Sequence, residues 1–301
     1  AWDEVERLHG GLPEDVILDL RWTSAAVGLI VGASLGLSGL MLQALLRNPL
    51  ASPFILGLSS GSALGVMVVI YLAHRMAVQW GPAAEPIAAV AGAGATLAIV
   101  YTLGQRRGWL DPLSLVLVGV VVSAMCGALI MLLQHLVPQG LRGNLVTWMM
   151  GNIDQGVRPG MLWFCGGIAG IGLLGGLAMS RAMDAAMLGD EEARSVGLSL
   201  PRLRLGLFVL AGVLAAMSVA LAGPIGFVGL IAPHAARLVL GPSHGPRVLG
   251  AALAGAMLMI SADVLSQLVS VRGGRMPVGV FTALAGGPTF LFLIRSRGRN
   301  L

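Results

Sequence analysis

Long unbroken runs of apolar residues recur along the whole chain, separated by short segments that hold most of the charged side chains. Because a helix rises about 1.5 Å per residue, roughly 20 apolar residues are needed to cross about 30 Å of hydrocarbon. The alternating strands of a membrane β-barrel would not give such runs. The pattern predicts an all-α polytopic membrane protein with about nine helices in this chain. The predicted spans are 22–45, 54–73, 86–104, 112–136, 160–180, 205–222, 226–240, 247–270 and 277–294.

The composition agrees with this prediction. Of the 301 residues, 56% are hydrophobic and 11% are charged, and 44 glycines come in addition. A soluble domain has about a quarter of its residues charged, so this chain has too little polar surface to cover a water-soluble globule. A cytosolic enzyme, a disordered chain and a fibrous protein are excluded. We expect one transmembrane permease domain over residues 1–301, in contact with membrane lipid.

The arginines indicate how the chain is oriented. All 19 basic residues are arginines and the net charge is +5; because they are scattered in short loops, topology explains them better than nucleic-acid binding. With the N-terminal segment outside, twelve arginines fall in inside loops and seven in outside segments. This bias predicts a periplasmic segment at 1–20, a cytoplasmic C-terminus and a cytoplasmic coupling loop at 181–204.

The sequence lacks the motifs of an enzyme or a metal site. It contains no Lys, so it cannot hold the P-loop, whose Lys reaches the phosphates of a nucleotide. Cys126 and Cys165 lie in apolar segments without metal-ligand spacing, and the histidines are dispersed. We therefore predict no catalytic residue, no metal ligand and no cofactor bound by this chain, and expect a partner to supply the energy.

Asp263 is the ionisable residue that clearly lies within a predicted span. A carboxylate at this depth is costly, and two interpretations remain. It relays protons in a proton-coupled secondary transporter, or it is a structural group buried against an Arg or backbone donors. We favour the structural interpretation.

Glycines and prolines mark close helix packing and broken helices. Glycines recur every fourth residue at 28–36 and again at 57–65, and such spacing lets helix backbones approach closely in lipid. In the segment 47–65, two prolines forbid a continuous helix, and Ser59, Ser60 and Gly61 suit a locally opened helix start. The segment 221–238 has the same character. Unwound backbone at membrane depth is tolerated only where protein or a water-filled cavity surrounds it.

The interior loop contains a candidate docking surface between Met187 and Arg204. Its acidic residues, Asp190 to Glu192, suit the first turn of a short helix because they complement the helix dipole. Gly197 is expected to end that helix and Pro201 to start another. Two short helices parallel to the membrane would form a surface for a cytoplasmic motor; a solvated loop is the alternative.

Several segments together resemble the FecCD family of ABC importer permeases, with the BtuC-like fold of type II ABC importers. The resemblance covers nearly the whole chain from Leu20 onward and implies a ten-helix subunit that pairs into a dimer, which we expect to be a homodimer. It also implies two ATPase subunits that bind ATP and Mg, a periplasmic substrate-binding protein, and a metal-chelate substrate passing along the dimer interface. The segments that carry it are 47–65, 147–152, 187–204, 221–238, 261–267 and 276–295.

The resemblance also assigns roles to individual residues. The segment from Gly189 to Leu200 corresponds to the family's ATPase-coupling helices, and Pro112 and Leu113 would lie near a cytoplasmic gate. We group Ser59, Ser60 and Gly61 with this pathway. The residues expected to contact the ATPase are Gly189, Asp190, Glu191, Glu192, Ala193, Arg194, Gly197 and Leu198.

The chain departs from the family pattern at three places. The family has a helix before the acidic N-terminal segment, and we expect the numbered chain to have lost it. Of the arginines that meet the binding protein in relatives, Arg21 matches and Ser24 does not. At the third such position, four residues after Asp263, this chain has Gln267. Arg272 and Arg275 lie nearby and are expected to supply the positive surface instead.

The resemblance implies the permease subunit of an importer in the bacterial inner membrane. We expect an iron chelate, haem or a ferric siderophore, as its substrate, because that is the broader part of the family. A cobalamin importer of the same family is the alternative, and a proton-coupled transporter that uses Asp263 is a rival of another class.

Overall fold

The computed structural model describes residues 14–297 except 79, 82, 107–108, 139–142, 144–145, 147, 155 and 272–273. In this part of the chain, nine helices contain 13 residues or more, which confirms the all-α prediction of about nine helices. Seven of the described helices are long and apolar enough to cross a membrane. The long helices are α2 (Glu14–Leu46), α3 (Leu58–Met76), α4 (Ala84–Leu103), α5 (Pro112–Leu136), α7 (Pro159–Met187), α9 (Leu200–Ala222), α10 (Val228–Leu240), α11 (His244–Leu268) and α12 (Val278–Arg297).

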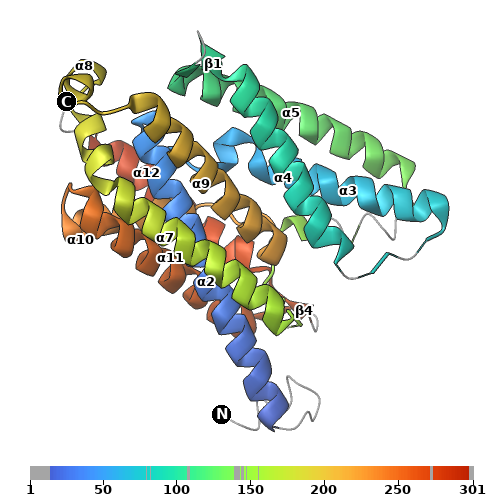
Figure 1. Ribbon diagram of the computed structural model, residues 1–301. Coiled ribbons are helices and arrows are strands. Elements are labelled where there is room, and N and C mark those ends of the chain that lie inside the picture. The colour runs from blue at the N-terminus through green and yellow to red at the C-terminus, as the bar shows by residue number, and fades with distance from the viewer. Residues whose placement is uncertain are drawn as a thin grey trace.

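Short elements join these helices. A 3₁₀ turn, η1 (Pro53–Leu56), precedes α3, and the six-residue helix α8 (Asp190–Ser195) connects α7 to α9. Two antiparallel hairpins complete the described elements: β1 (Gln105–Arg106) pairs with β2 (Trp109–Leu110), and β3 (Ser270–Val271) pairs with β4 (Gly274–Arg275). Figure 1 shows α8 at one end of the bundle and the start of α2 at the opposite end.

At three places the helix ends differ from the bounds of the predicted segments. The segment 1–20 is helical from Glu14 onward, so α2 extends beyond the apolar run. The predicted span 54–73 is divided into η1 and α3. The interior loop predicted at 181–204 is reduced to residues 188–199, because α7 continues to Met187 and α9 begins at Leu200. Pro201 therefore starts a membrane helix and not a second short one, since its missing N–H is not needed in a first helical turn.

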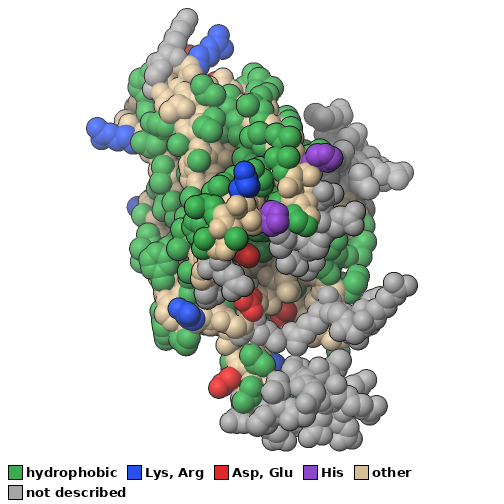
Figure 2. Space-filling model, turned by 90° about the vertical axis from the view of Figure 1, so that its right-hand side faces the viewer, with side chains coloured by type: hydrophobic (Ala, Val, Ile, Leu, Met, Phe, Trp, Pro, Cys, Tyr) green, Lys and Arg blue, Asp and Glu red, His purple; other side chains and the backbone are tan. Residues whose placement is uncertain are grey.

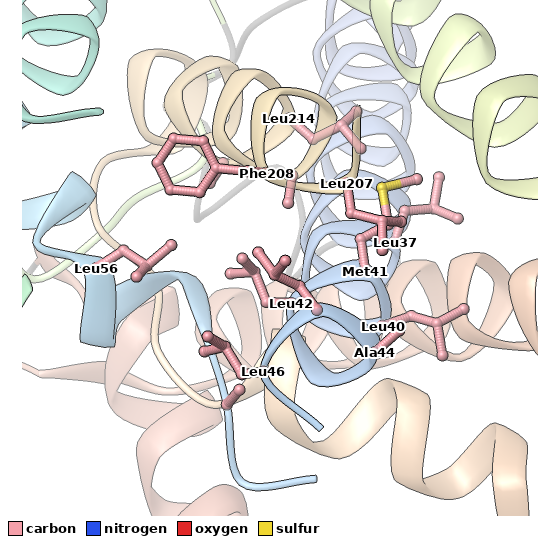
Figure 3. Packing of buried hydrophobic residues seen from close by; sticks show 14 of the residues in the cluster. Leu37, Leu40, Met41, Leu42, Ala44, Leu46, Leu56, Leu207, Phe208 and Leu214 are labelled. Atoms are coloured by element: carbon pink, nitrogen blue, oxygen red, sulfur yellow. The ribbon is translucent and has the colours of Figure 1, made fainter. Parts of the chain in front are cut away.

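Helices α2 and α9 form the centre of the bundle. Leu37 and Met41 of α2 pack beside Leu207 of α9, as Figure 3 shows, and all three side chains are buried. Helix α11 approaches α2 closely through glycine: a Cβ at Gly32 would overlap the carbonyl of Gly255, and a Cβ at Gly255 would overlap that of Gly32. The predicted packing role of the first glycine series is confirmed, because only bare backbones fit at this separation.

Helices α3, α4 and α5 form a second group on one side of α9 (Figure 1). Gly61 of α3 and Gly92 of α4 are in backbone contact, so the second glycine series also serves close packing. Hydrophobic side chains cover much of the described surface in Figure 2, and a few charged and histidine side chains lie between them. The exposed apolar side chains suit a lipid environment or a second transmembrane subunit.

Two stretches of irregular backbone lie inside the bundle, as the prolines predicted. Gly57 has a φ of 76° between η1 and α3, and Gly223 has a φ of 69° where α9 ends. The segment 223–227 is half-buried or buried, and the amide of Asn152 donates to the carbonyl of Ala222 at 2.9 Å. Protein therefore surrounds the unwound backbone and satisfies part of its hydrogen bonding.

Candidate functional site

The short helix α8 has the local structure that its sequence predicts. Three acidic residues occupy its first turn, and Gly197 follows it with a φ of 79°. The amide of Leu198 donates to the carbonyl of Ala193 at 3.0 Å, and that of Gly197 to Arg194 at 2.9 Å. These two bonds form a Schellman motif, in which a residue with positive φ ends the helix. The prediction that Gly197 ends this helix is confirmed.

Asp190 anchors α8 to the two central helices. Its Oδ1 accepts from Nη2 of Arg47 at 2.5 Å, and both carboxylate oxygens accept from Nη2 of Arg204, at 3.0 and 2.9 Å. Arg47 directly follows α2, and Arg204 lies in the second turn of α9. Partial burial alone raises the pKa of Asp190, but the charges and hydrogen bonds of Arg204 and Arg47 outweigh it and hold that pKa below its ordinary value.

Arg204 also links this ion-pair cluster to the start of α5. Its Nη1 donates to the carbonyl oxygen of Leu110 at 3.4 Å. The next residue, Asp111, caps α5 by accepting from the amide and hydroxyl of Ser114 at 2.9 and 2.7 Å. These hydrogen bonds from Ser114 lower the pKa of Asp111. One guanidinium therefore contacts both the carboxylate that anchors α8 and the backbone that leads into α5.

The residues predicted to form a pathway do not share one surface. Pro112 is the first residue of α5, and the Leu113 side chain is 68% exposed. Ser59 is buried, and the hydroxyl of Ser60 donates to the carbonyl of Gly57 at 2.9 Å. A Cβ at Gly61 would overlap the hydroxyl of Thr96 on α4. Thus residues 59–61 pack inside the α3–α5 group, and Leu113 points out of it.

Two of the three residues predicted to contact a binding protein, Arg21 and Arg275, belong to elements at the end of the bundle opposite α8. Arg21 is exposed on α2, and Arg275 belongs to β4, which lies with the first half of α2 toward the lower end in Figure 1. Arg272 lies outside the described residues.

Asp263 lies on α11, near the same end, and is 8% exposed. The side chain of Gln267 donates to its Oδ2 at 2.8 Å. We expected an Arg or backbone N–H groups to donate to the Asp263 carboxylate. In the structure, one donor is the side-chain amide of Gln267. Gln267 stands where the family resemblance led us to expect an Arg, and its amide gives the carboxylate a local hydrogen bond.

Sequence reasoning missed the long-range ion pairs. Asp190 was interpreted only through the helix dipole, although its partner Arg47 is 143 positions away. Asp184 was not singled out, yet its Oδ1 accepts from Nδ1 of His244 at 2.6 Å and from the His244 amide at 2.9 Å. The sequence does indicate that ion pairs form here, because the few acidic residues near the interior loop lie among several arginines. It does not indicate which arginine pairs with which carboxylate.

Among the described residues, no three His, Cys, Asp or Glu side chains converge as metal ligands would. The described site thus offers ion pairs and helix contacts, which can transmit movement between elements. Nothing in the geometry of α8 resembles the acid, base or nucleophile arrangement of an enzyme.

Comparison with known proteins gives one consistent relationship. The chain matches the model of the FecCD transport family over residues 2–296. It is 35% identical over 277 residues to the hemin transport system permease protein HmuU of Yersinia pestis, covering 92% of this chain and 82% of that protein. It is 34% identical over 307 residues to the cobalamin import system permease protein BtuC of Halobacterium salinarum, covering 96% of this chain and 77% of that protein. It is 35% identical over 306 residues to the Fe(3+)-citrate import system permease protein YfmD of Bacillus subtilis, covering 100% and 85%.

Solved structures agree with these sequences. A metal-chelate type ABC transporter in an inward-facing conformation matches with a TM-score of 0.82 at 30% identity, over 93% of this chain and 88% of that chain. PsaBC from Streptococcus pneumoniae, in complex with a Fab, matches with a TM-score of 0.53 at 15% identity, which indicates a shared fold alone.

Proposed function

Because the chain belongs to the FecCD transport family, we propose that it carries an iron chelate, haem or a ferric siderophore, across the bacterial inner membrane. The chain is a multi-pass permease subunit of an ABC importer for iron chelates or cobalamin; it is not an enzyme, and ATP is hydrolysed on a separate subunit. The observation that carries the choice of substrate is the near-full-length similarity to a hemin permease and an Fe(3+)-citrate permease. Cobalamin is the second candidate, because a cobalamin permease is similar to the same degree.

In this proposal two copies of the chain form the transmembrane part. Two ATPase subunits, which hold the ATP and Mg, bind at the end that carries α8, and a periplasmic binding protein docks at the end that carries Arg21. The segment 189–198 contacts the ATPase. The support is its position at one end of the bundle and its ion-pair connection to both central helices.

The same geometry suggests how movement reaches the pathway. An ATPase that displaces α8 pulls on Asp190, and the pull acts on α2 through Arg47 and on α9 through Arg204. Arg204 also holds the carbonyl of Leu110, two residues before the start of α5. Displacement of α8 is therefore proposed to change the position of α5, whose first residues were assigned to the gate.

Uptake by the reconstituted importer tests the substrate. Proteoliposomes that contain this chain, its ATPase and its binding protein are supplied separately with haem, a ferric siderophore and cobalamin, each radiolabelled. We expect ATP-dependent accumulation of an iron chelate, and an ATPase without hydrolytic activity is the control. Accumulation of cobalamin with no uptake of either iron chelate would replace the proposed substrate with the second candidate.

A further inference from the structure

A cavity of about 360 Å³ lies where four helix ends meet. It is lined by residues from the end of α2, the end of α7, the end of α10 and the start of α11. Three arginines, Arg47, Arg237 and Arg247, contribute to its walls, and Asp184 and His244 complete its charged and titratable lining. The cavity is thus predominantly basic.

The Asp184 carboxylate in the cavity already accepts hydrogen bonds from neighbouring residues. Oδ1 of Asp184 accepts from the ring and the amide of His244, and its Oδ2 accepts from the hydroxyl of Ser243 at 3.3 Å. Arg47 is paired with Asp190. Among the described residues, neither Arg237 nor Arg247 forms an ion pair with a carboxylate. These two guanidinium groups therefore lack a direct carboxylate partner, and the Asp184 carboxylate acts on Arg247 only at longer range.

Arg247 gives the clearest indication that the cavity suits an anion. The residue is only 7% exposed, and its Nη1 donates to the carbonyl of Pro242 at 3.2 Å, but its Nε has no hydrogen-bond partner in the described structure. A buried donor without a partner costs free energy, and more so when it carries charge. A planar guanidinium with free N–H groups is well suited to phosphate oxygens.

The cavity lies at the depth of lipid headgroups. Arg47 follows the last residue of the α2 span, Met187 is the last residue of the α7 span, and His244 is the first of the α11 span. Beside Arg237, the side chains of Leu238 and Val239 are 74% and 82% exposed, which provides an apolar surface for acyl chains. Basic pockets between transmembrane helices on the cytoplasmic side are typical sites for anionic headgroups.

We propose that this cavity binds the phosphate headgroup of an anionic phospholipid. Arg247 and Arg237 donate to the phosphate oxygens, Arg47 contributes charge at the wall, and the acyl chains extend over Leu238 and Val239. The proposal does not depend on which chelate is transported, because the cavity is formed by helix ends and its occupant comes from the bilayer. A soluble phosphate or a carboxylate of a protein partner would satisfy the same donors, and the experiment separates these sources.

Native mass spectrometry of the complete importer tests the site. The complex, in micelles of a zwitterionic detergent, is titrated with dioleoylphosphatidylglycerol, with dioleoylphosphatidylcholine and with soluble glycerol 3-phosphate. We expect phosphatidylglycerol to bind more tightly than either other probe. Arg237→Gln should weaken its binding about fivefold, as expected for one arginine near an anionic lipid surface. Arg237→Lys keeps the charge and should retain most of the affinity.

Arg202→Gln is the matched control, because Arg202 is exposed in the first turn of α9 and does not line the cavity. It should leave the affinity for phosphatidylglycerol within twofold of the unmodified protein. Equal loss in the Arg237→Gln and Arg202→Gln variants, or equal binding of the two lipids, would overturn the proposal. Glycerol 3-phosphate that competes as well as the lipid would assign the cavity to a soluble anion. Binding to the isolated chain that is lost when the ATPase joins would assign it to a protein carboxylate.

Discussion

Removing the charge of Asp190 tests the connection between α8 and the rest of the bundle. Asp190→Asn keeps the size of the side chain and removes the negative charge that faces Arg47 and Arg204. Glu191→Gln is the matched control, because Glu191 is exposed on the same helix and forms no ion pair with a described residue.

The expected magnitude follows from the exposure of the three side chains. Asp190 is 36% exposed, Arg47 34% and Arg204 18%. Ion pairs of such exposure contribute about 0.2–1 kcal/mol each, since solvent screens them and side-chain entropy opposes them. Loss of both pairs should therefore lower the free energy of unfolding by about 0.4–2 kcal/mol. A change of that size alters the population of a two-state element about two- to thirtyfold.

The assay measures stability and coupling together. Equilibrium unfolding in mixed micelles gives the change in free energy, and proteoliposomes with ATPase and binding protein give the number of substrate molecules transported per ATP. We expect Asp190→Asn to lower this ratio about fivefold, with ATP hydrolysis continuing, and Glu191→Gln to leave the free energy of unfolding unchanged. A double-mutant cycle with Arg204→Gln should show an interaction energy of about 0.5–1 kcal/mol.

The stabilisation by Asp190 also has a defined pH dependence. Its pKa is lower in the folded protein than the value of about 3.9 expected in the unfolded chain. The stabilising contribution is therefore complete above about pH 4 and is lost as the pH falls through the lower, folded-state value. The difference between the unmodified protein and Asp190→Asn should be the same at pH 7 and pH 5 and should shrink below pH 4. Additive effects in the cycle, or normal coupling in Asp190→Asn, would refute the reasoning.

Three other substitutions test separate parts of the account. Gly197→Ala should destabilise α8 by about 1–2 kcal/mol and reduce coupling, because φ is positive at this residue although an added Cβ has free space. Gly197→Asn should destabilise α8 less. Equal melting temperatures for the unmodified protein and both variants would contradict this. Gly32→Ala should lower the melting temperature by several degrees, because its Cβ overlaps the Gly255 carbonyl, whereas Gly94→Ala should have little effect since a Cβ there meets nothing within 4 Å. Arg21→Gln should weaken docking of the binding protein at low salt and much less at high salt; unchanged affinity at low salt, measured by surface plasmon resonance, would exclude Arg21 from the docking surface.

The membrane helices could be predicted from sequence because the hydrocarbon thickness fixes the length of an apolar run. The errors occurred where that rule does not apply. Helix α2 begins at Glu14, before the predicted span, since a helix can continue beyond the hydrocarbon as long as its residues permit it. The predicted span before the interior loop stops short of the end of α7, and the span after it begins later than α9. At both places the helix continues through charged residues, arginines and Asp184, that interrupt the apolar run.

The candidate site was only partly predictable. The acidic first turn and the terminal glycine of α8 are local signals, because helix capping depends on neighbouring residues. The pairing of Asp190 with Arg47 and Arg204 depends on how α2 and α9 pack, and no local pattern encodes it. The same holds for the basic cavity, whose lining comes from four separate helix ends.

The source of energy is the most direct test of the central claim that this chain is a conduit powered by a separate ATPase. Proteoliposomes that contain this chain alone, or with its ATPase and binding protein, are given a labelled iron chelate under an imposed proton gradient or with ATP. We predict accumulation only when the ATPase is present and hydrolyses ATP, with no effect of the gradient and a normal rate for Asp263→Asn. Accumulation against a concentration gradient by the chain alone, driven by protons and abolished in Asp263→Asn, would contradict the account.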